Sequence, residues 1–461
     1  MITTPQREPG VTTSEPPATT VNGSNYVLAW TTSDQAIWWT TCPASANQKS
    51  YDWAKEAQFI NAASSGGPAL ASFKNTAYLA WKGEAADTRI FVASLDGTNW
   101  SAPTPIAGIG TSAAPALASD GSALFLVWKG EHDDTLYVAK SSDGKSWGAS
   151  AVISGASSSD TPALAAYQSG LALAFKGASD DAVYLAEYTD AKGWGKAVKL
   201  NDVLTSCGPA LAFGNTGNLH LVTKGHVDDF LWESVRNAGS SNFSPQAKIV
   251  GVGTDVRPAL ASQPSAATDI LFAWKNGTTS GLLIAPLDGL HRLYPTATPV
   301  VTATTLTWGV PKTGFGSGAS GAAFDASLTI SSDGKATFSG AYWDYGSIPV
   351  FDAPAQDYTA VIAVLGANKV GFTFTHSKND VATGGTEDTW NTTATNDAIA
   401  KNWQYLQPRP GVGVPQAVVR VSCSNNSDLG AFLDEVISDL EALVGDVETA
   451  VQWVSVIAAA V

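Results

Sequence analysis

The residues best suited to chemistry in this chain are lysines and aspartates that stand beside aromatic side chains. The segment WKGEHDDTLYVAKSSDGKSW, residues 128–147, contains such a group, and its polar part recurs as KGEAAD, KGASDD and KGHVDD. An aromatic ring can stack on the C–H groups of a sugar, while charged groups bond its hydroxyls. The candidate ligand contacts are therefore Trp30, Trp81, Lys82, Asp87, Trp128, Lys129, Asp134, Phe175, Lys176, Asp181, Lys224, Asp229 and Trp274.

A structural interpretation of the same residues stays open beside the ligand-binding one. A scaffold built from repeats also requires the same residue at the same place in each copy. In that interpretation the lysines and aspartates pair across their loop, and the aromatic rings pack between neighbouring repeats.

The repeat itself is unambiguous. GPALAS, APALAS, TPALAA and GPALAF begin successive copies, and their prolines Pro68, Pro115, Pro162 and Pro209 recur every 47 residues. Pro258 begins a further copy, and an eroded first copy begins at Pro17. A period of this length is typical of solenoids and propellers. We count six copies.

Each copy is predicted to contain four short strands. In the second copy these are PALAS, TAYLAWK, TRIFVAS and SAPTPIA, and strands two and three alternate in polarity as half-buried antiparallel strands do. Four strands in each of six copies predict an all-β fold with a six-bladed β-propeller over residues 15–304. Residues 1–14 form a Thr/Pro-rich lead-in that can supply a closing strand.

In several copies the turn between strands three and four carries an Asp-Gly pair, as at Asp96 and Asp143. An Asp at this position can accept hydrogen bonds from amides of its own turn, so we expect a structural role. The aromatic residues that follow are expected to wedge between blades: Trp53, Trp100, Trp147, Trp194 and Phe243.

The segments SLDGTNW and SSDGKSW resemble a shortened Asp-box, the S-x-D-x-G-x-T-W turn of sialidase-type propellers. The PALAS opening with a terminal Trp also resembles bacterial and fungal propeller lectins. The resemblance covers the propeller region only. It implies a propeller whose ligands bind on the face opposite the Asp-boxes, where the loops between strands two and three emerge.

A catalytic role is not expected. A sialidase needs three arginines on the substrate carboxylate, a nucleophilic Tyr with a Glu, and an acid Asp, whereas this region holds only Arg89, Arg236, Arg257 and Arg292. The five histidines show no zinc-site spacing. We expect no cofactor and no metal. A pair of glycosidase carboxylates stays open as an alternative, because folding sets their separation.

The formal net charge of −15 argues against nucleic acid as a partner, since phosphate backbones attract Lys and Arg. Three widely spaced cysteines, Cys42, Cys207 and Cys423, favour buried thiols, with one disulfide as the alternative. The sequence as given shows no secretory signal. We nevertheless expect an extracellular protein, exported by a route that the sequence does not reveal.

The C-terminal third departs from the repeat. Residues 305–423 are predicted to form a small β-rich, sandwich-like domain, with a short helix capped by Asn396. Residues 424–461 are predicted to form an amphipathic helix, because apolar residues follow one another at intervals of three and four over Leu433–Val461. This helix is expected to pack within the chain; oligomerisation and membrane contact are the alternatives.

These observations favour a non-catalytic, multivalent carbohydrate-binding protein that recognises glycans or glycoproteins through repeated sites. Two alternatives remain at this point. One is a secreted toxin or effector, in which the propeller recognises a receptor and the C-terminal part assembles or inserts. The other is a glycoside hydrolase with a sialidase-like fold.

Overall fold

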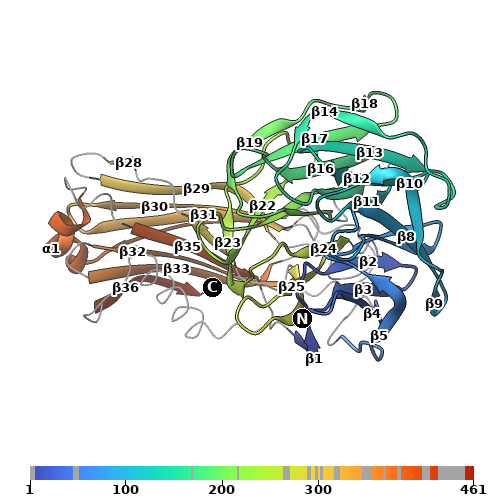
Figure 1. The fold of residues 1–461 in the computed structure, drawn as a ribbon. Coiled ribbons are helices and arrows are strands. Elements are labelled where there is room, and N and C mark those ends of the chain that lie inside the picture. The colour runs from blue at the N-terminus through green and yellow to red at the C-terminus, as the bar shows by residue number, and fades with distance from the viewer. Residues whose placement is uncertain are drawn as a thin grey trace. The chain divides into compact units, whose positions relative to one another are not determined.

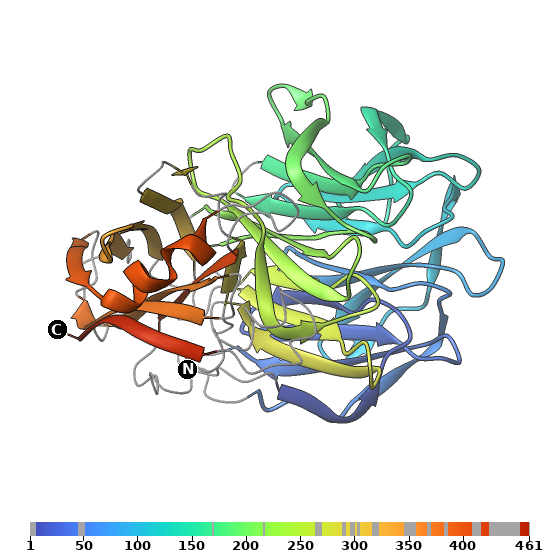
Figure 2. The same ribbon diagram turned by 90° about the vertical axis from the view of Figure 1, so that its left-hand side faces the viewer.

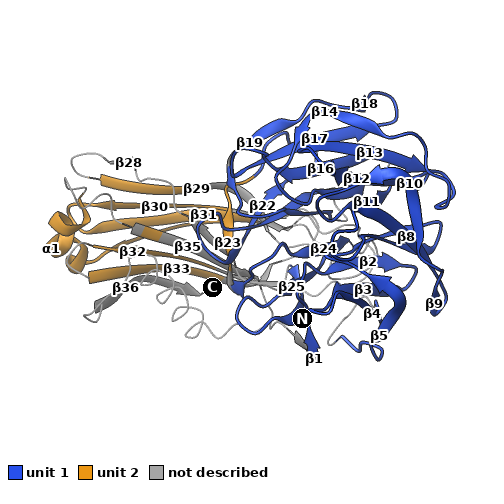
Figure 3. Cartoon of the chain, in the orientation of Figure 1, with its two compact units in different colours: residues 1–243, 251–290, 317–319 blue, residues 244–250, 291–316, 320–461 orange. Residues whose placement is uncertain are grey.

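The chain divides into two compact units (Figure 3). Unit 1 comprises Met1–Phe243, Gly251–Leu290 and Ser317–Ala319; unit 2 comprises Ser244–Val250, His291–Gly316 and Ser320–Val461. The computed structural model describes residues 6–44, 51–167, 170–214, 217–262, 270–287, 292–295, 300–301, 305–315, 322–344, 356–366, 370–381, 386–407, 416–423 and 452–460.

Unit 1 is a β-propeller of six antiparallel blades (Figures 1 and 2). The first blade contains β2 (Ala18–Asn22), β3 (Asn25–Thr31), β4 (Ala36–Pro43) and β5 (Ala57–Ala63). The second contains β6 (Ala69–Phe73), β7 (Thr76–Lys82), β8 (Arg89–Asp96), β9 (Asn99–Trp100) and β10 (Thr104–Gly110). The third contains β11 (Ala116–Ser119), β12 (Leu124–Lys129), β13 (Thr135–Ser141) and β14 (Ala151–Ser157). The fourth blade contains β15 (Ala163–Tyr167), β16 (Gly170–Lys176), β17 (Ala182–Thr189), β18 (Gly193–Trp194) and β19 (Val198–Leu204). The fifth contains β20 (Ala210–Phe213), β21 (Leu219–Lys224), β22 (Phe230–Arg236) and β23 (Ala247–Gly253). The sixth contains β24 (Ala259–Ser262), β25 (Ile270–Lys275), β26 (Gly281–Pro286) and β1 (Gln6–Thr12).

The N-terminal segment closes the ring. Strand β1 pairs antiparallel with β26, with Gln6 opposite Ile284 and Thr12 opposite Gly281, so the sixth blade takes its outer strand from the start of the chain. The first strands of successive blades contact one another in the order β2, β6, β11, β15, β20, β24 and back to β2. The expectation that the lead-in supplies a closing strand is confirmed.

The core of the propeller lies between neighbouring blades. One cluster joins Phe59 and Ile37 of the first blade to Leu79 and Trp81 of the second, and Trp100 packs against it. Its ring lies 5.8 Å from that of Phe59 and 5.7 Å from that of Trp39. The other predicted wedge residues pack against the corresponding clusters: Trp53, Trp147, Trp194 and Phe243. Their predicted role is confirmed.

The second strands are more buried than their sequence alternation predicts. In β7 every residue from Ala77 to Lys82 is buried, whereas β8 alternates between buried and more exposed positions. The prediction of a half-buried second strand is therefore wrong. A blade has a neighbour on each face, so both faces of its inner strands are covered and small residues on one face pack against the next blade.

The Asp143 turn has the predicted structural role. The Asp143 carboxylate accepts hydrogen bonds from the amides of Lys145 (2.8 Å) and Ser146 (2.7 Å) and from the Ser141 hydroxyl (3.0 Å). These bonds hold the pKa of Asp143 well below its usual range, with the Ser146 amide the largest cause. Gly144 takes a left-handed conformation, with φ of 73°.

Unit 2 is a two-sheet, sandwich-like structure. One sheet contains β28 (Val300–Val301), β29 (Thr305–Phe315), β30 (Ala322–Ser331), β31 (Lys335–Asp344) and β34 (Thr386–Thr395). The other contains β27 (Arg292–Pro295), β35 (Gln416–Cys423), β32 (Gln356–Leu365), β33 (Val370–Val381) and β36 (Gln452–Ala460). A buried cluster includes Trp308 and Phe338 from the first sheet and Ile362 and Phe374 from the second.

The predicted short helix is α1 (Asp397–Leu406). Asn396 caps it as predicted, because its side-chain oxygen accepts a hydrogen bond of 2.9 Å from the amide of Ala398. The buried residues of α1 are Ile399 and Leu406.

The predicted C-terminal helix over Leu433–Val461 is wrong for its last part. Gln452–Ala460 forms strand β36, which pairs parallel with β33. This segment contains Val454, Val456 and Ile457, which are β-branched residues that favour strands, and the segment adds a strand to the sheet beside β33. Residues 424–451 lie outside the described part of the chain. Among the described residues, no helix combines the length and apolar character that a membrane crossing needs.

The close approach of blades near the propeller axis generates a stability prediction. A Cβ atom at Gly208 would lie 2.3 Å from the carbonyl oxygen of Thr161 in the adjacent connection. We expect Gly208→Ala to lower the free energy of unfolding by about 1–3 kcal/mol, because the blades must separate to admit the methyl group. Chemical denaturation measures the change.

Gly148→Ala is the matched control, because a Cβ there meets only the carbonyl oxygen of Lys140, at an ordinary 3.5 Å. Equal stability of Gly208→Ala and Gly148→Ala would contradict a close-packed axis.

Candidate functional site

The predicted lysine and aspartate residues meet in the loops between strands two and three. In the third blade, Lys129 Nζ lies 2.9 Å from the Asp134 carboxylate, 2.9 Å from the Ser112 hydroxyl and 3.2 Å from the carbonyl oxygen of Asp133. The ammonium group thereby connects this loop to the segment that enters the blade. The fourth and fifth blades repeat the arrangement with Lys176, Asp181 and Ser159, and with Lys224, Asp229 and Ser206.

The second blade departs from this pattern. Lys82 donates to the Ser65 hydroxyl (2.7 Å) and to the carbonyl oxygen of Ala85 (3.1 Å), but the Asp87 carboxylate pairs with Arg89, at 2.7 Å. The KGEAAD loop has one residue more than KGEHDD before the third strand. The grouping of Asp87 with Asp134, Asp181 and Asp229 is therefore corrected.

The sixth and first blades differ again. Lys275 occupies the lysine position of the sixth blade and pairs with Asp255 at 2.6 Å. The first blade has Thr31 at this position, and its hydroxyl donates to the carbonyl oxygen of Gly66.

The aromatic rings that were predicted to stack on a sugar are not on the surface. Trp30, Trp81 and Phe175 are each 1% exposed, Trp128 is 2% exposed and Trp274 is fully buried. A ring covered to this degree has no face for a sugar, so the prediction that these rings stack on a ligand is corrected. Their positions agree with the structural interpretation, in which they pack between blades.

A second set of aromatic residues, missed by the sequence analysis, covers these buried rings. Phe91, Tyr137 and Tyr184 lie on the third strands and stack on Trp81, Trp128 and Phe175, with centroid distances of 5.6–5.9 Å. They are partly exposed. Trp38 and Trp232 hold the same position in the first and fifth blades.

An aspartate precedes each of these aromatic residues by four positions. In the third blade the Asp133 carboxylate accepts hydrogen bonds from the amide of Thr135 (2.8 Å) and the hydroxyl of Tyr137 (3.1 Å). The equivalent carboxylates accept from the amide two residues ahead: Asp34, Asp87, Asp180 and Asp228. The signal is visible in the sequence as D-x-x-x-aromatic in DQAIW, DTRIF, DDTLY, DDAVY and DDFLW.

The first two blades enclose a hollow that brings such residues together. Its volume is about 460 Å³, within the size range of small-ligand sites. The first blade contributes Asp34, Gln58 and Asn61, and the second contributes Asp87, Glu84, Arg89, Phe91 and the edge of Trp81. Carboxylate, amide and guanidinium groups therefore converge beside a partly exposed aromatic ring.

The electrostatics of the hollow favour charged hydrogen-bonding groups. The Arg89 guanidinium contacts both oxygens of Asp87, with its Nε at 2.9 and 3.2 Å, and lowers the pKa of that carboxyl. Asp87 in turn raises the pKa of Arg89. The hydroxyl of Thr32 lowers the pKa of Asp34. Both carboxyl groups are therefore ionised at neutral pH and accept hydrogen bonds.

Two of the cysteines, Cys42 and Cys207, are thiols. Cys42 is buried and Cys207 is half-buried, and neither forms a disulfide. The side chain of Cys423 lies outside the described part of the chain. Within the described residues, no group of three or more His, Cys, Asp or Glu side chains is arranged to hold a metal ion.

The fold and this site define a six-bladed β-propeller protein with a hollow between two blades. No protein-family model and no curated protein sequence matches the chain. Similar solved structures include the Hadza microbial sialidase Hz136, with 15% identity over 60% of this chain and 66% of that one and a TM-score of 0.47. The six-bladed fungal lectin of Aleuria aurantia has 12% identity over 59% and 95% of the two chains, with a TM-score of 0.41. The SapL1 lectin, solved with alpha methyl fucoside, has 16% identity over 60% and 97%, also with a TM-score of 0.41. These likenesses assign no ligand or activity to this chain.

The lysine contacts generate a test that separates a structural role from ligand contact. Lys129 is 13% exposed in its side chain and makes three polar contacts, whereas Asp134 is 52% exposed. We expect Lys129→Met to lower the free energy of unfolding by about 1–2 kcal/mol, because it removes hydrogen bonds to the Ser112 hydroxyl and a loop carbonyl. Asp134→Asn should cost less than about 0.5 kcal/mol, since an exposed ion pair contributes little.

Denaturant titration of both variants provides the measurement. Unchanged stability of Lys129→Met together with altered glycan binding would instead support the ligand-contact interpretation.

The thiol of Cys207 should be unreactive in the folded protein. Burial, with a further contribution from Asp160, raises the pKa of Cys207 to about 12. At pH 8 only about one thiol in 10,000 is then the reactive thiolate. We expect iodoacetamide to modify Cys207 at least about 100-fold more slowly in the native than in the denatured protein, as peptide mass spectrometry measures. Similar rates in the two states would contradict this prediction.

Proposed function

We propose that the protein binds carbohydrate without catalysis, and that the hollow between the first two blades is its principal site. The observation that carries this proposal is the Arg89–Asp87 ion pair beside the partly exposed ring of Phe91. Arg89 is 60% exposed in its side chain. The guanidinium group of Arg89 lies over the Phe91 ring, 5.0 Å from its centroid, and Trp81 stacks on the same ring. A sugar would therefore bind chiefly through hydroxyls on the Arg89–Asp87 pair, with C–H groups against the ring edge.

The charge state of the hollow supports binding over hydrolysis. A glycosidase general acid needs a carboxyl group whose pKa is raised, so that it carries a proton at neutral pH. In Asp34 and Asp87 the pKa shifts in the opposite direction. These two carboxylates suit hydrogen bonding to hydroxyl groups and do not suit proton donation.

The other blades offer weaker versions of the same site. Asp133 with Tyr137, and Asp180 with Tyr184, repeat the carboxylate and ring without an arginine. Positions equivalent to Arg89 are occupied by Ala36, Thr135, Ala182 and Phe230. Several weak sites on one ring increase attachment to a surface that displays many glycans. As part of the same proposal we place the protein outside the cell, where such surfaces are exposed.

Glycan-array binding of the full chain tests this function. We expect the parent to bind one class of glycan and Arg89→Ala to bind it at least about tenfold more weakly, because a charge-assisted hydrogen bond is lost from the site. Thr135→Ala is the matched control, since it alters the equivalent position of the next blade, and it should retain most of the binding. Thermal unfolding of each variant monitors folding.

Three outcomes would contradict the proposal: no glycan bound by the parent, equal binding by parent and Arg89→Ala, or turnover of aryl glycosides by the parent.

A further inference from the structure

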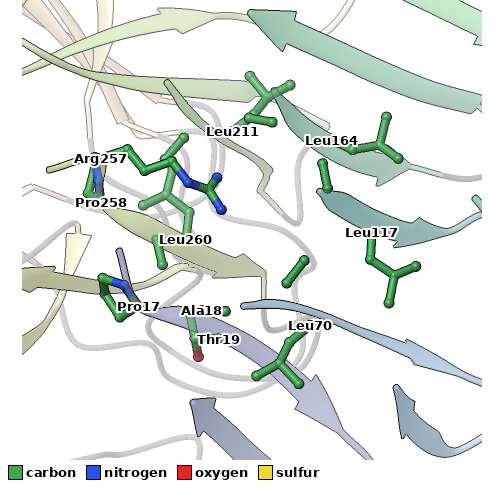
Figure 4. A pocket seen from close by; sticks show the side chains of 15 residues that line it. Pro17, Ala18, Thr19, Leu70, Leu117, Leu164, Leu211, Arg257, Pro258 and Leu260 are labelled. Atoms are coloured by element: carbon green, nitrogen blue, oxygen red, sulfur yellow. The ribbon is translucent and has the colours of Figure 1, made fainter. Parts of the chain in front are cut away.

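A second cavity lies on the propeller axis, away from the hollow between the blades. It is lined by residues of all six first strands and has a volume of about 70 Å³ (Figure 4). Most of its wall is apolar, with one leucine from each of five blades: Leu70, Leu117, Leu164, Leu211 and Leu260. The first blade has Thr19 at this position.

One charged residue breaks this apolar lining. Arg257 precedes Pro258 at the start of the sixth blade, and its guanidinium group points into the cavity (Figure 4). The corresponding residues of the other blades carry no charge: Pro16, Gly67, Ala114, Thr161 and Gly208. The side chain of Arg257 passes Gly208, where its Cδ lies 3.4 Å from the place that a Cβ would occupy. The arginine side chain therefore runs alongside the Gly208 backbone at contact distance.

The guanidinium group of Arg257 is incompletely paired. Its Nε is buried and has no hydrogen-bond partner among the described residues. None of the ion pairs within the described part of the chain includes Arg257. Arg257 as a whole is partly exposed, so only part of its charged group is removed from water without a partner. That part costs free energy, and the position therefore favours a ligand of opposite charge.

Nearby acidic residues weaken the preference of Arg257 for an anion but do not remove it. Burial lowers the pKa of Arg257, and the negative charge of Asp160 opposes that shift. Glu15 also lies at this end of the axis, and its own pKa is raised by burial. Asp160 and Glu15 both lie two residues before the proline that begins a first strand. An anion at Arg257 would therefore bind against some repulsion from Asp160.

We propose that the axial cavity is an oxyanion site, in which Arg257 binds a carboxylate or phosphate group. A guanidinium group presents paired N–H donors that match the oxygens of such anions. The cavity is small, and its lining offers few polar groups besides Arg257 and Thr19, so it suits a single acidic group better than a sugar ring with many hydroxyls. The anion is therefore either a small free ion or the acidic group of a larger molecule that reaches in from the surface.

This inference does not rest on carbohydrate binding in the hollow, which involves other residues.

Anion-dependent stability of the full chain tests the proposal. At constant ionic strength, inorganic phosphate or acetate should raise the melting temperature of the parent by about 2 °C or more relative to chloride. Arg257→Gln should abolish this rise. Arg236→Gln is the matched control, since Arg236 is a partly buried arginine already paired with Glu187 at 2.6 Å, and it should respond as the parent does.

A third variant keeps the test decisive if Arg257→Gln folds poorly. Asp160→Asn removes the neighbouring negative charge and should bind acetate several-fold more tightly in calorimetric titration. A titration with glucuronate then distinguishes the two sources: tighter binding than acetate indicates a larger acidic molecule, and equal or weaker binding indicates a free ion.

The proposal is overturned if neither phosphate nor acetate stabilises the parent, or if Arg257→Gln responds as the parent does. It is also overturned if Asp160→Asn binds acetate no more tightly, since the bound anion then does not lie beside Arg257 and Asp160.

Discussion

The propeller depends on two consecutive residues in each connection between blades. In the connection to the third blade, the amide of Thr111 donates to the carbonyl oxygen of Thr88 in the second blade, while the hydroxyl of Ser112 donates to the carbonyl oxygen of Gly130 in the third. One dipeptide therefore bonds two adjacent blades. The first residue of each such pair is buried and bonds its hydroxyl to the carbonyl oxygen two residues ahead: Thr13, Ser64, Thr111, Ser158, Thr205 and Thr254. A buried hydroxyl without a partner costs about 1–3 kcal/mol, so each position strongly favours Thr or Ser.

This arrangement determines which polar residues are left for a ligand. The lysine of each loop donates to the second residue of the dipeptide, as Lys129 does to Ser112 and Lys275 does to Asp255. The ring also closes through the same contact, because Thr13 bonds Ser280 of the sixth blade and Ser14 bonds Thr31 of the first. The repeated lysines therefore have structural partners, while contact between them and a ligand stays a prediction. The third strands, which lie farther from the axis, retain partly exposed aromatic rings.

The sequence predicts the blades well because the six copies repeat one pattern of turns and strands. The prolines and Asp-Gly turns set the strand boundaries, and the wedge position of Trp100 follows from its place after a turn. The burial of Trp81 and Trp128 does not follow, because alternation within one strand cannot show that a second blade covers the other face. The tail fails for a related reason: Val454 and Ile457 fit an apolar helical stripe and a strand equally well, and pairing with β33 decides between them. The hollow was missed because Arg89 and Asp34 come from different copies, and their proximity depends on the packing of blades.

Departures from the repeat are stronger functional evidence here than the repeat itself. A residue repeated from blade to blade can serve a contact that the blades share, and Lys129, Lys176 and Lys224 each make such a contact with the segment that enters their blade. Arg89 and Arg257 are not repeated from blade to blade. Arg89 occupies a position that is Thr or Ala in the neighbouring blades, and Arg257 occupies a position near the axis that is uncharged in the other blades. Each places a guanidinium group in a cavity, and at the axis the cost of burying that charge acts on stability directly. A chain that retains such a charge without an ion-pair partner among its described residues is therefore expected to gain binding energy from it.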